Sequence, residues 1–541
     1  MNFLPIAIRE LQVTARRAMT YYWRSLSALN AACLTLGFLL AGFSGAVSAS
    51  SAGLMTFQIL SGIGYAIAAG GAALATCDCI SEERRDGTLG FLFLTDLKGY
   101  DIILGKMARL STPVYCLIAT FPALGFTMLL GGVSFGDFAR IALSLVNTLF
   151  FFSALGLLVS ARSWDGRAAV SAAMLGVVII TAPMMAAILG LDLSGPGMVL
   201  LLPTPGGAFL AALYSTAITV SKPPFFLSLA VSHALGWLFI AAASRMVTRH
   251  FSREEPPPPA RVRPAAGLNP ALALHARNME RNPWRPVWLL AALVAMIALT
   301  AALISPATWY DIPTFAAIVL GLHAILKFWT ANSACRSFPS RRHSGELEIL
   351  LTTPLDGDAI LLGSTTALKH ELLRPFLFVA AMDVLLLILG WRKLGIWEGF
   401  PFAGAMLLEF LWFIGNLYSL TWVGLWMGLK TASHAKALGR TLFYILFLPW
   451  SGLAVAAAFF GLVTMGGSLS PGMGALTVAE FVVALAVCNL GFTGWAVSEL
   501  RDRFRLLAAN QPLPPERFLP PWQPILDKLR RWRWKRAPQA A

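Results

Sequence analysis

The chain has 541 residues, of which 57% are hydrophobic and only 13% are charged. A soluble globular protein carries about 25% charged residues, so most of this chain cannot face water. Its six cysteines all lie within or beside apolar segments, which excludes the disulfide framework of a small secreted protein.

Several apolar segments are long enough to cross a membrane. A span needs about 20 residues to cross a hydrocarbon core of ~30 Å, and its backbone must be paired within a helix because lipid offers no hydrogen bonds. The sequence predicts an all-α integral membrane protein with about twelve transmembrane helices, arranged as two six-helix repeats. The predicted spans are 26–48, 55–77, 110–130, 138–161, 168–190, 225–246, 287–305, 312–334, 373–390, 402–428, 441–464 and 474–498.

The positive charges predict the orientation of these spans. Lysines and arginines gather on the cytosolic side of membrane proteins. With both termini in the cytosol, five of the 42 lysines and arginines fall elsewhere: Arg140, Lys222, Arg392 and Lys393 in outer loops, and Lys327 within a span. The net charge of +15 is therefore interpreted as an orientation signal of a multi-pass protein of the cell (inner) membrane, and no nucleic acid is expected as a partner.

The chain divides into two halves that resemble each other. Each half opens with a polar helix before its first span, starting at Pro5 and Pro270, and the fourth spans are similar from Asn147 and Asn416 onward, with one residue of slippage. The expected units are a first six-span repeat (1–248), a Pro/Arg-rich cytosolic linker (249–269), a second six-span repeat (270–505) and a Pro-rich basic cytosolic tail (506–541). The tail suits adhesion to anionic lipid headgroups.

One loop occurs twice, after the second span of each half. Residues 84–105 and 342–363 align without a gap, and identical residues include Arg84 and Arg342, Gly87 and Gly345, Leu89 and Leu347, and Leu92 and Leu350. In each copy a charged lead, which contains Glu83 in the first, precedes a short helix at Gly87–Leu94 or Gly345–Leu351. Such a helix is about 12 Å long, too short to cross the membrane.

The apolar face of each short helix needs cover. Its residues recur at helical spacing, and they are Leu89, Leu92 and Phe93 in the first copy and Leu347, Leu350 and Leu351 in the second. Periodicity alone favours a helix that lies on lipid over one that docks on a partner.

The pattern of the loop resembles a known family. Glu83, Arg84, Gly87-Thr88-Leu89, Leu92, Thr95 and Leu97, followed by Gly105-Lys106, are similar to the permease subunits of type-2 ABC exporters, and the second copy matches through Gly345-Glu346-Leu347, Leu350-Leu351 and Thr353-Pro354-Leu355. In that family the loop is the coupling helix that seats on a separate ATPase subunit, and the helix before the first span packs beside it.

The resemblance implies two permease halves fused in one chain, which would bind two copies of the ATPase. The ATPase-coupling residues would be Glu83, Arg84, Gly87, Leu89 and Leu92, with Arg342, Gly345, Leu347 and Leu350. The second loop departs from the pattern, because it lacks the leading glutamates and has Ser364 where Lys106 stands. If the lead acids bind the ATPase, the second site binds it more weakly.

The sequence offers no catalytic, cofactor or metal site of its own. A phosphate-binding loop GxxxxGK[ST] is absent, as are HExxH and GxSxG, so ATP would be used by the partner subunit and the chain itself is expected not to be an enzyme. Two other functions stay open. One is a membrane anchor that relays ATPase motion to an envelope assembly, and the other is a twelve-span secondary transporter, since Arg84-Arg85-Asp86-Gly87 resembles a facilitator loop.

Ionisable residues within the spans of the second half form the last candidate site. Charged residues inside the membrane are expensive and mark functional sites by default. Lys327 needs a carboxylate partner or a wet cavity, and Asp383 or Glu409 could supply that partner. The hypothesis is a polar path or a structural ion pair formed by Lys327, Asp383 and Glu409.

Overall fold

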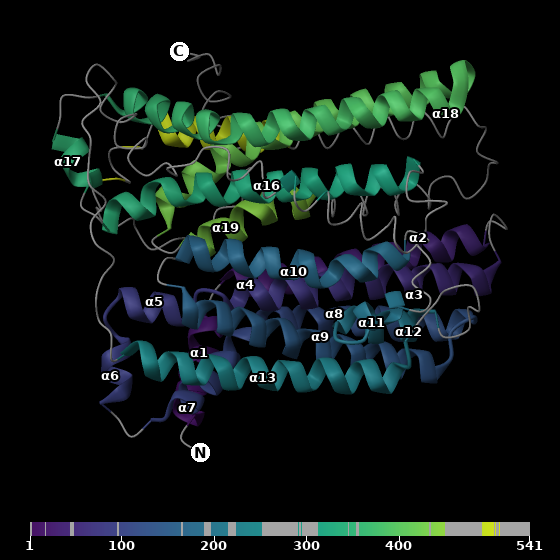
Figure 1. The fold of residues 1–541 in the computed structure, drawn as a ribbon, viewed down its shortest axis with the longest axis horizontal. Helices are drawn as coiled ribbons and strands as arrows, with labels where there is room; N and C mark the ends of the chain where they lie inside the picture. The colour runs from purple at the N-terminus through teal and green to yellow at the C-terminus, as the bar shows by residue number, and fades with distance from the viewer. Residues whose placement is uncertain are drawn as a thin grey trace, which may run out of the picture.

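The computed structural model is an assembly of long helices that lie side by side (Figure 1). It describes residues 3–16, 18–43, 48–94, 97–163, 166–188, 196–214, 223–251, 312–343, 346–352, 356–431, 434–449 and 489–501, together with Leu290, Ala291, Val294, Phe504 and Ala508. Within these residues there is no strand.

The first half begins with a helix that lies before the first long one. Its elements are α1 (Leu4–Ala15), α2 (Ala18–Phe43), α3 (Ala49–Ala66), η1 (Ile67–Gly71), α4 (Ala72–Thr76), α5 (Cys79–Arg85), α6 (Leu89–Phe93), α7 (Gly99–Lys106), η2 (Met107–Leu110), α8 (Ser111–Leu130), α9 (Phe135–Arg162), α10 (Gly166–Ile188), α11 (Pro196–Leu201), α12 (Pro205–Leu213) and α13 (Phe225–Phe251).

The described part of the second half has fewer elements. They are α16 (Ile312–His343), α17 (Glu346–Thr352), α18 (Gly357–Lys430), α19 (His434–Leu442) and η3 (Phe443–Phe447). The long element α18 is two helices joined at Gly395, whose φ of 73° lies in the region that favours glycine. We call the two helices the first arm and the second arm of α18.

Among the described residues, eight helices are long and apolar enough to cross a membrane: Thr20–Leu40, Ala49–Arg85, Gly99–Leu130, Phe135–Arg162, Phe225–Thr248, Ile318–Pro339, Gly357–Gly395 and Phe402–Lys430. Each matches one predicted span. The predicted span 168–190 is a shorter apolar helix, Ala168–Met184. Predicted spans 287–305, 441–464 and 474–498 fall largely outside the described residues. The described part of the chain is thus helical throughout its regular structure, with the long apolar helices of a membrane-embedded protein.

The second and fourth long helices of the first half cross closely. A Cβ at Gly156 of α9 would collide with the Thr76 hydroxyl and come within 3.0 Å of the Ala73 carbonyl, so only glycine permits this approach. The second half has a comparable crossing, where a Cβ at Gly424 would lie 2.7 Å from Cβ of Ala334.

Two buried asparagines at corresponding positions of the two halves form similar hydrogen bonds. Asn147 donates to the hydroxyl of Ser232 in α13 over 2.8 Å. In the second half, Asn416 accepts from Nδ2 of Asn489 over 2.6 Å. Asn147 and Asn416 are the first residues of the similar stretches in the sequence, and each bonds to a helix near the end of its own half.

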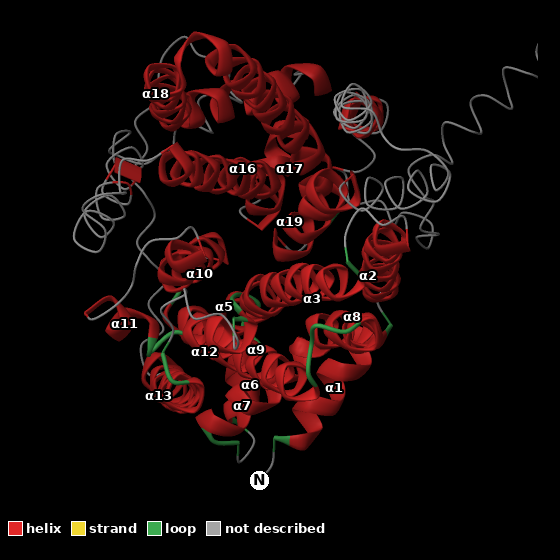
Figure 2. Ribbon diagram, turned by 90° about the vertical axis from the view of Figure 1, so that its right-hand side faces the viewer, coloured by secondary structure: helices red, strands yellow, loops and turns green. Residues whose placement is uncertain are grey.

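The two halves meet along α10 and α16. Asn332 of α16 donates to the Ser171 hydroxyl of α10 over 2.9 Å. Val170 and Ala173 of α10 share a buried apolar cluster with Cys335 of α16. Viewed along the helices, α10 lies between α16 on one side and α11, α12 and α13 on the other (Figure 2).

Candidate functional site

The first copy of the duplicated loop starts at the C-terminus of α5. Gly87 has a φ of 70°, the N–H of Gly87 bonds to the Arg84 carbonyl, and the N–H of Thr88 bonds to the Glu83 carbonyl over 2.9 Å. These two bonds are the Schellman pattern that ends helices at a left-handed glycine. Gly87 therefore sets the direction in which the chain leaves α5 and enters α6.

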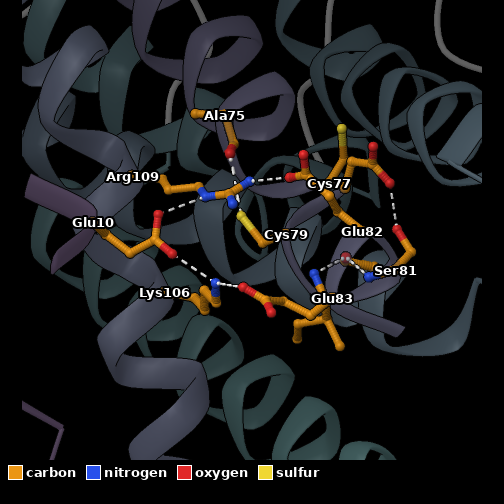
Figure 3. Close-up of polar contacts among 12 residues, drawn as sticks. Glu10, Ala75, Cys77, Cys79, Ser81, Glu82, Glu83, Lys106 and Arg109 are labelled. Atoms are coloured by element: carbon orange, nitrogen blue, oxygen red, sulfur yellow. Dashed lines mark hydrogen bonds and ion pairs between the residues drawn. The ribbon is translucent and has the colours of Figure 1, made fainter. Parts of the chain in front are cut away.

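Two acids of the charged lead, Glu82 and Glu83, form ion pairs within the chain, and Glu83 is buried there (Figure 3). The ammonium of Lys106 lies 2.5 Å from Glu83 and 2.6 Å from Glu10 of α1. Lys106 is almost completely buried, and the Glu83 carboxylate also accepts a hydrogen bond from the Thr88 hydroxyl. Glu83 thus stabilises its own loop and does not present its charge at the surface.

A second cation extends this network. Arg109 of η2 donates to Glu10 over 2.9 Å and to Glu82 of α5 over 3.0 Å. Burial opposes the ionisation of Glu10, but Arg109 and Lys106 outweigh it and lower the pKa of Glu10 to about 2. We call Glu10, Glu82, Glu83, Lys106 and Arg109 the loop network; it joins α1, α5 and the start of the helix that contains α8.

Arg84 also binds within the chain. Its guanidinium donates to the Ala161 carbonyl over 3.0 Å, at the C-terminal end of α9. Neighbouring Arg85 pairs with Asp78 over 3.0 Å. The arginines of the lead therefore position α6 relative to the second and fourth long helices. Within the chain Glu83 pairs with Lys106, and its assignment as an ATPase-coupling residue stays a prediction.

Both copies of the loop contain the short helix, but its predicted apolar face packs against other helices of the same chain. Leu89 of α6 is buried against Ile103 and Val247, and Leu92 packs at the edge of the same cluster. In α17, Leu347 and Leu350 are buried in the cluster that contains Phe338. These leucines secure the loop helices to the long helices.

The opposite faces of α6 and α17 expose one large apolar residue each at aligned positions. Phe91 is 69% exposed and Ile349 is 66% exposed. Phe91 lies two residues after Leu89, and Ile349 lies two residues after the aligned Leu347. Leu94, just after α6, is also exposed. The periodicity had indicated an apolar face on each helix, but Phe91 and Ile349 lie on the faces that it did not select.

Part of the second loop is not placed. Arg342 lies in the last turn of α16, and the structure describes its backbone only; Gly345 lies outside the described residues. At the position of Lys106, Ser364 donates to the Ile360 carbonyl of its own helix over 2.9 Å. The ion pairs of Lys106 therefore have no counterpart at Ser364.

Asp383 and Glu409 meet a histidine, where a pair with Lys327 was predicted. Nε2 of His323 lies 3.0 Å from Asp383 and Nδ1 lies 2.9 Å from Glu409. The Lys327 ammonium lies over the Phe413 ring, 5.6 Å from its centroid, and forms no ion pair within 4.0 Å with a described carboxylate. The predicted ion pair between Lys327 and these acids is therefore wrong. His323, which lies one turn from Lys327 on the same helix, contacts both acids instead.

Sequence reasoning left His323 out of this site. A single histidine in an apolar helix has no local motif, and its partners are 60 and 86 residues away. The available signal was that ionisable residues occur on three neighbouring spans of one half, including His323 itself.

Comparison with models of known protein families finds no match for this chain, and comparison with curated protein sequences finds none either.

Proposed function

We propose that this chain is the membrane-spanning permease subunit of an ATP-driven exporter of the type-2 ABC class. In this proposal it forms the translocation path, and two copies of a separate ATPase subunit dock on α6 and α17 from the cytosol. One observation carries the proposal. The two short helices bury aligned leucines against the rest of the chain, and each exposes a large apolar side chain, Phe91 or Ile349, at an aligned position.

The location of these helices suits two equivalent partners. Figure 1 draws α6 and α17 at the same end of the long helices. The charge distribution predicts that this end is cytosolic, because the loops there carry the arginines and lysines. Exposed apolar side chains outside the membrane favour burial against another protein, since burial of apolar area is the main favourable term in association.

The loop network gives α6 a stiff connection to the membrane helices. Lys106 joins Glu83 of α5 to Glu10 of α1, and Arg84 ties α5 to the end of α9. A displacement of α6 would therefore be transmitted to the second and fourth long helices together. This is the mechanical property that an ATP-driven rearrangement of the path requires.

The likeness between the halves supports two docking sites of similar design. The close crossings at Gly156 and Gly424 and the buried bonds of Asn147 and Asn416 recur in both halves. Two related halves in one chain would bind two copies of one ATPase through pseudo-equivalent surfaces. ATP is then used by the partner, membrane lipid surrounds the spans, and nucleic acid is not a partner.

A co-purification experiment tests the proposal. The tagged chain is isolated from its native membranes with and without Phe91→Asp or Ile349→Asp, and bound subunits are identified by mass spectrometry and assayed for ATP hydrolysis. Phe135→Asp is the matched control, because Phe135 is 74% exposed at the start of α9, after the turn that follows α8.

We expect an ABC-type ATPase with the original chain and with Phe135→Asp, and a reduced amount with each loop variant at equal membrane levels. Equal ATPase recovery with Phe91→Asp, Ile349→Asp and their combination would contradict the docking assignment. Absence of any ATPase from the original complex would contradict the functional class.

A further inference from the structure

The cluster around His323 is a set of metal-binding groups inside the membrane-embedded part of the second half. His323 comes from α16 and is 1% exposed, Asp383 comes from the first arm of α18, and Glu409 comes from the second arm. One ligand atom from each residue lies within 4.8 Å of the others. Three separate helices thus bring an imidazole and two carboxylates to one point.

The hydrogen bonds of the cluster call for a positive charge, supplied either by a protonated His323 or by a bound cation. A neutral imidazole has one N–H, yet both ring nitrogens of His323 face carboxylate oxygens at 2.9 and 3.0 Å. One nitrogen would then direct a lone pair at an anionic oxygen. In addition, Oε2 of Glu409 is buried without a hydrogen-bond partner among the described residues. A buried carboxylate oxygen without a partner is unfavourable, and a cation bound beside Glu409 would pair with it.

Lys327 does not fill that role. Its ammonium lies over the ring of Phe413 and not within ion-pair distance of either acid. Phe413 in turn stacks on His323, with ring centroids 3.9 Å apart and planes 8° from parallel. This stacking restricts the rotation of the imidazole ring.

The first half has neither the histidine nor the aspartate of this cluster at the corresponding positions. Extending the gap-free alignment of the duplicated loops in both directions places Tyr65 and Gly125 of the first half at the positions of His323 and Asp383. Tyr65 packs against Phe209 in an apolar cluster. The first half therefore has no histidine–aspartate contact at these positions, and the cluster is a specialised feature of the second half.

We propose that His323, Asp383 and Glu409 bind a divalent transition-metal ion of the Zn²⁺ or Mn²⁺ kind. One nitrogen and several carboxylate oxygens form a donor set that suits such ions better than Mg²⁺ or Ca²⁺, which prefer oxygen alone. Two carboxylates and a divalent cation are together neutral, which reduces the cost of the site within the membrane. The imidazole nitrogen that does not ligate the metal donates to one oxygen of the carboxylate that it faces, which sets the tautomer and leaves the other oxygen of that carboxylate for the metal.

The site differs from the sequence-based expectation, which assigned no metal to this chain. It is also independent of the proposed ATPase partner, because it lies among α16 and the arms of α18 and involves neither α6 nor α17. Failure of one proposal therefore leaves the other standing.

Metal titration of the purified full-length chain in detergent tests the site. After treatment with a chelator, Zn²⁺ binding is measured by calorimetry, and Co²⁺ is used as a probe whose visible absorption reports nitrogen and oxygen ligation. We expect one tight Zn²⁺ per chain, displacement of Co²⁺ by Zn²⁺, and a rise in melting temperature on binding. His323→Gln, Asp383→Asn and Glu409→Gln should each weaken Zn²⁺ binding by at least about tenfold.

His233→Gln is the matched control, because His233 lies in a long helix of the first half and bonds to Asn147 and Trp237, not to a carboxylate. It should leave the tight site unchanged. Two results would overturn the proposal: no stoichiometric binding of Zn²⁺, Mn²⁺ or Co²⁺ by the original chain, or binding that all three cluster variants retain. Each variant is first checked for a single elution peak, and where one is misfolded the other two decide the question.

Discussion

The ammonium of Lys106 lies 2.6 Å from the carboxylate of Glu10, although 96 residues separate them in the chain. Through this contact the helix before the first span is fixed to the start of the helix that follows the duplicated loop. Ile6 of α1 adds close packing there, since a Cβ at Gly105 would lie 2.6 Å from Cβ of Ile6. The duplicated loop, α1 and the third long helix are therefore joined by both an ion pair and close packing.

Replacement of Lys106 should destabilise the protein. Lys106→Met leaves Glu10 and Glu83 without their shared cation in a buried position, and breaking such an interaction costs about 3–5 kcal/mol. The measurement is thermal unfolding of the purified chain, followed by size-exclusion chromatography. Arg140→Met is the control, because Arg140 is 47% exposed and 3.9 Å from Asp137, a pair worth about 0–1 kcal/mol. Equal melting temperatures for the two variants would contradict this role of Lys106.

The same network predicts a pH dependence of stability. Because Arg109 and Lys106 lower the pKa of Glu10 from 4.5 to about 2, the folded state favours the ionised carboxylate. The stabilisation is fully present above the unfolded value of 4.5 and is lost as the pH falls toward 2. Glu10→Gln should therefore be less stable than the original chain at pH 7, and the difference should shrink as the pH is lowered from about 4.5. A difference that stays constant down to pH 3 would contradict the assignment.

The spans could be read from the sequence because long apolar segments in lipid have few alternatives to helix. The short helices after the second span of each half were also predictable from Leu89 and Leu347 at helical spacing. What periodicity cannot give is the neighbour that covers a face. Leu347 and Leu350 are covered by the chain itself, and Ile349 is left outside. The difference depends on how α17 is attached to α16, which no local pattern encodes.

The charges were harder to assign for the same reason. Glu83 was predicted as an ATPase-coupling residue, but the sequence did not indicate that Lys106 would pair with both Glu83 and Glu10 within the chain. Those contacts join residues far apart in sequence. Likewise, Asp383 and Glu409 were recognised as buried acids, but the choice between Lys327 and His323 depends on the rotation of α16 about its own axis.

The glycine crossings offer a stability test in each half. Gly156→Ala and Gly424→Ala place a methyl group against Thr76 and Ala334, and overpacking of this kind costs about 1–3 kcal/mol. Gly62→Ala is the control, because a Cβ at Gly62 of α3 meets no atom within 4 Å. We expect lower melting temperatures for the two crossing variants only. If Gly424→Ala is as stable as Gly62→Ala, the helices that carry Gly424 and Ala334 do not approach each other this closely.

A topology measurement tests the orientation that the proposed function needs. Cytosolic placement of Lys98 and outer placement of Gly132 follow from the charge distribution, and the helix Gly99–Leu130 separates the two positions. Alkaline phosphatase fused after Gly132 should be active, and the same reporter fused after Lys98 or at Pro257 should be inactive. Activity at Lys98 would place the duplicated loop outside and exclude docking of a cytosolic ATPase.

A double-variant cycle with Lys327 and Asp383 distinguishes the predicted ion pair from the geometry observed. An ion pair predicts that Lys327→Met and Asp383→Asn are each strongly destabilising and that the double variant recovers stability. In the structure the Lys327 ammonium lies over Phe413 and Asp383 contacts His323. We therefore expect Lys327→Met to fold at normal levels, Asp383→Asn to be the more damaging change, and the double variant to show the sum of the two effects. Melting temperatures of all three variants provide the measurement. Recovery of stability in the double variant would restore the direct lysine–aspartate pair and remove the basis for assigning Asp383 to His323.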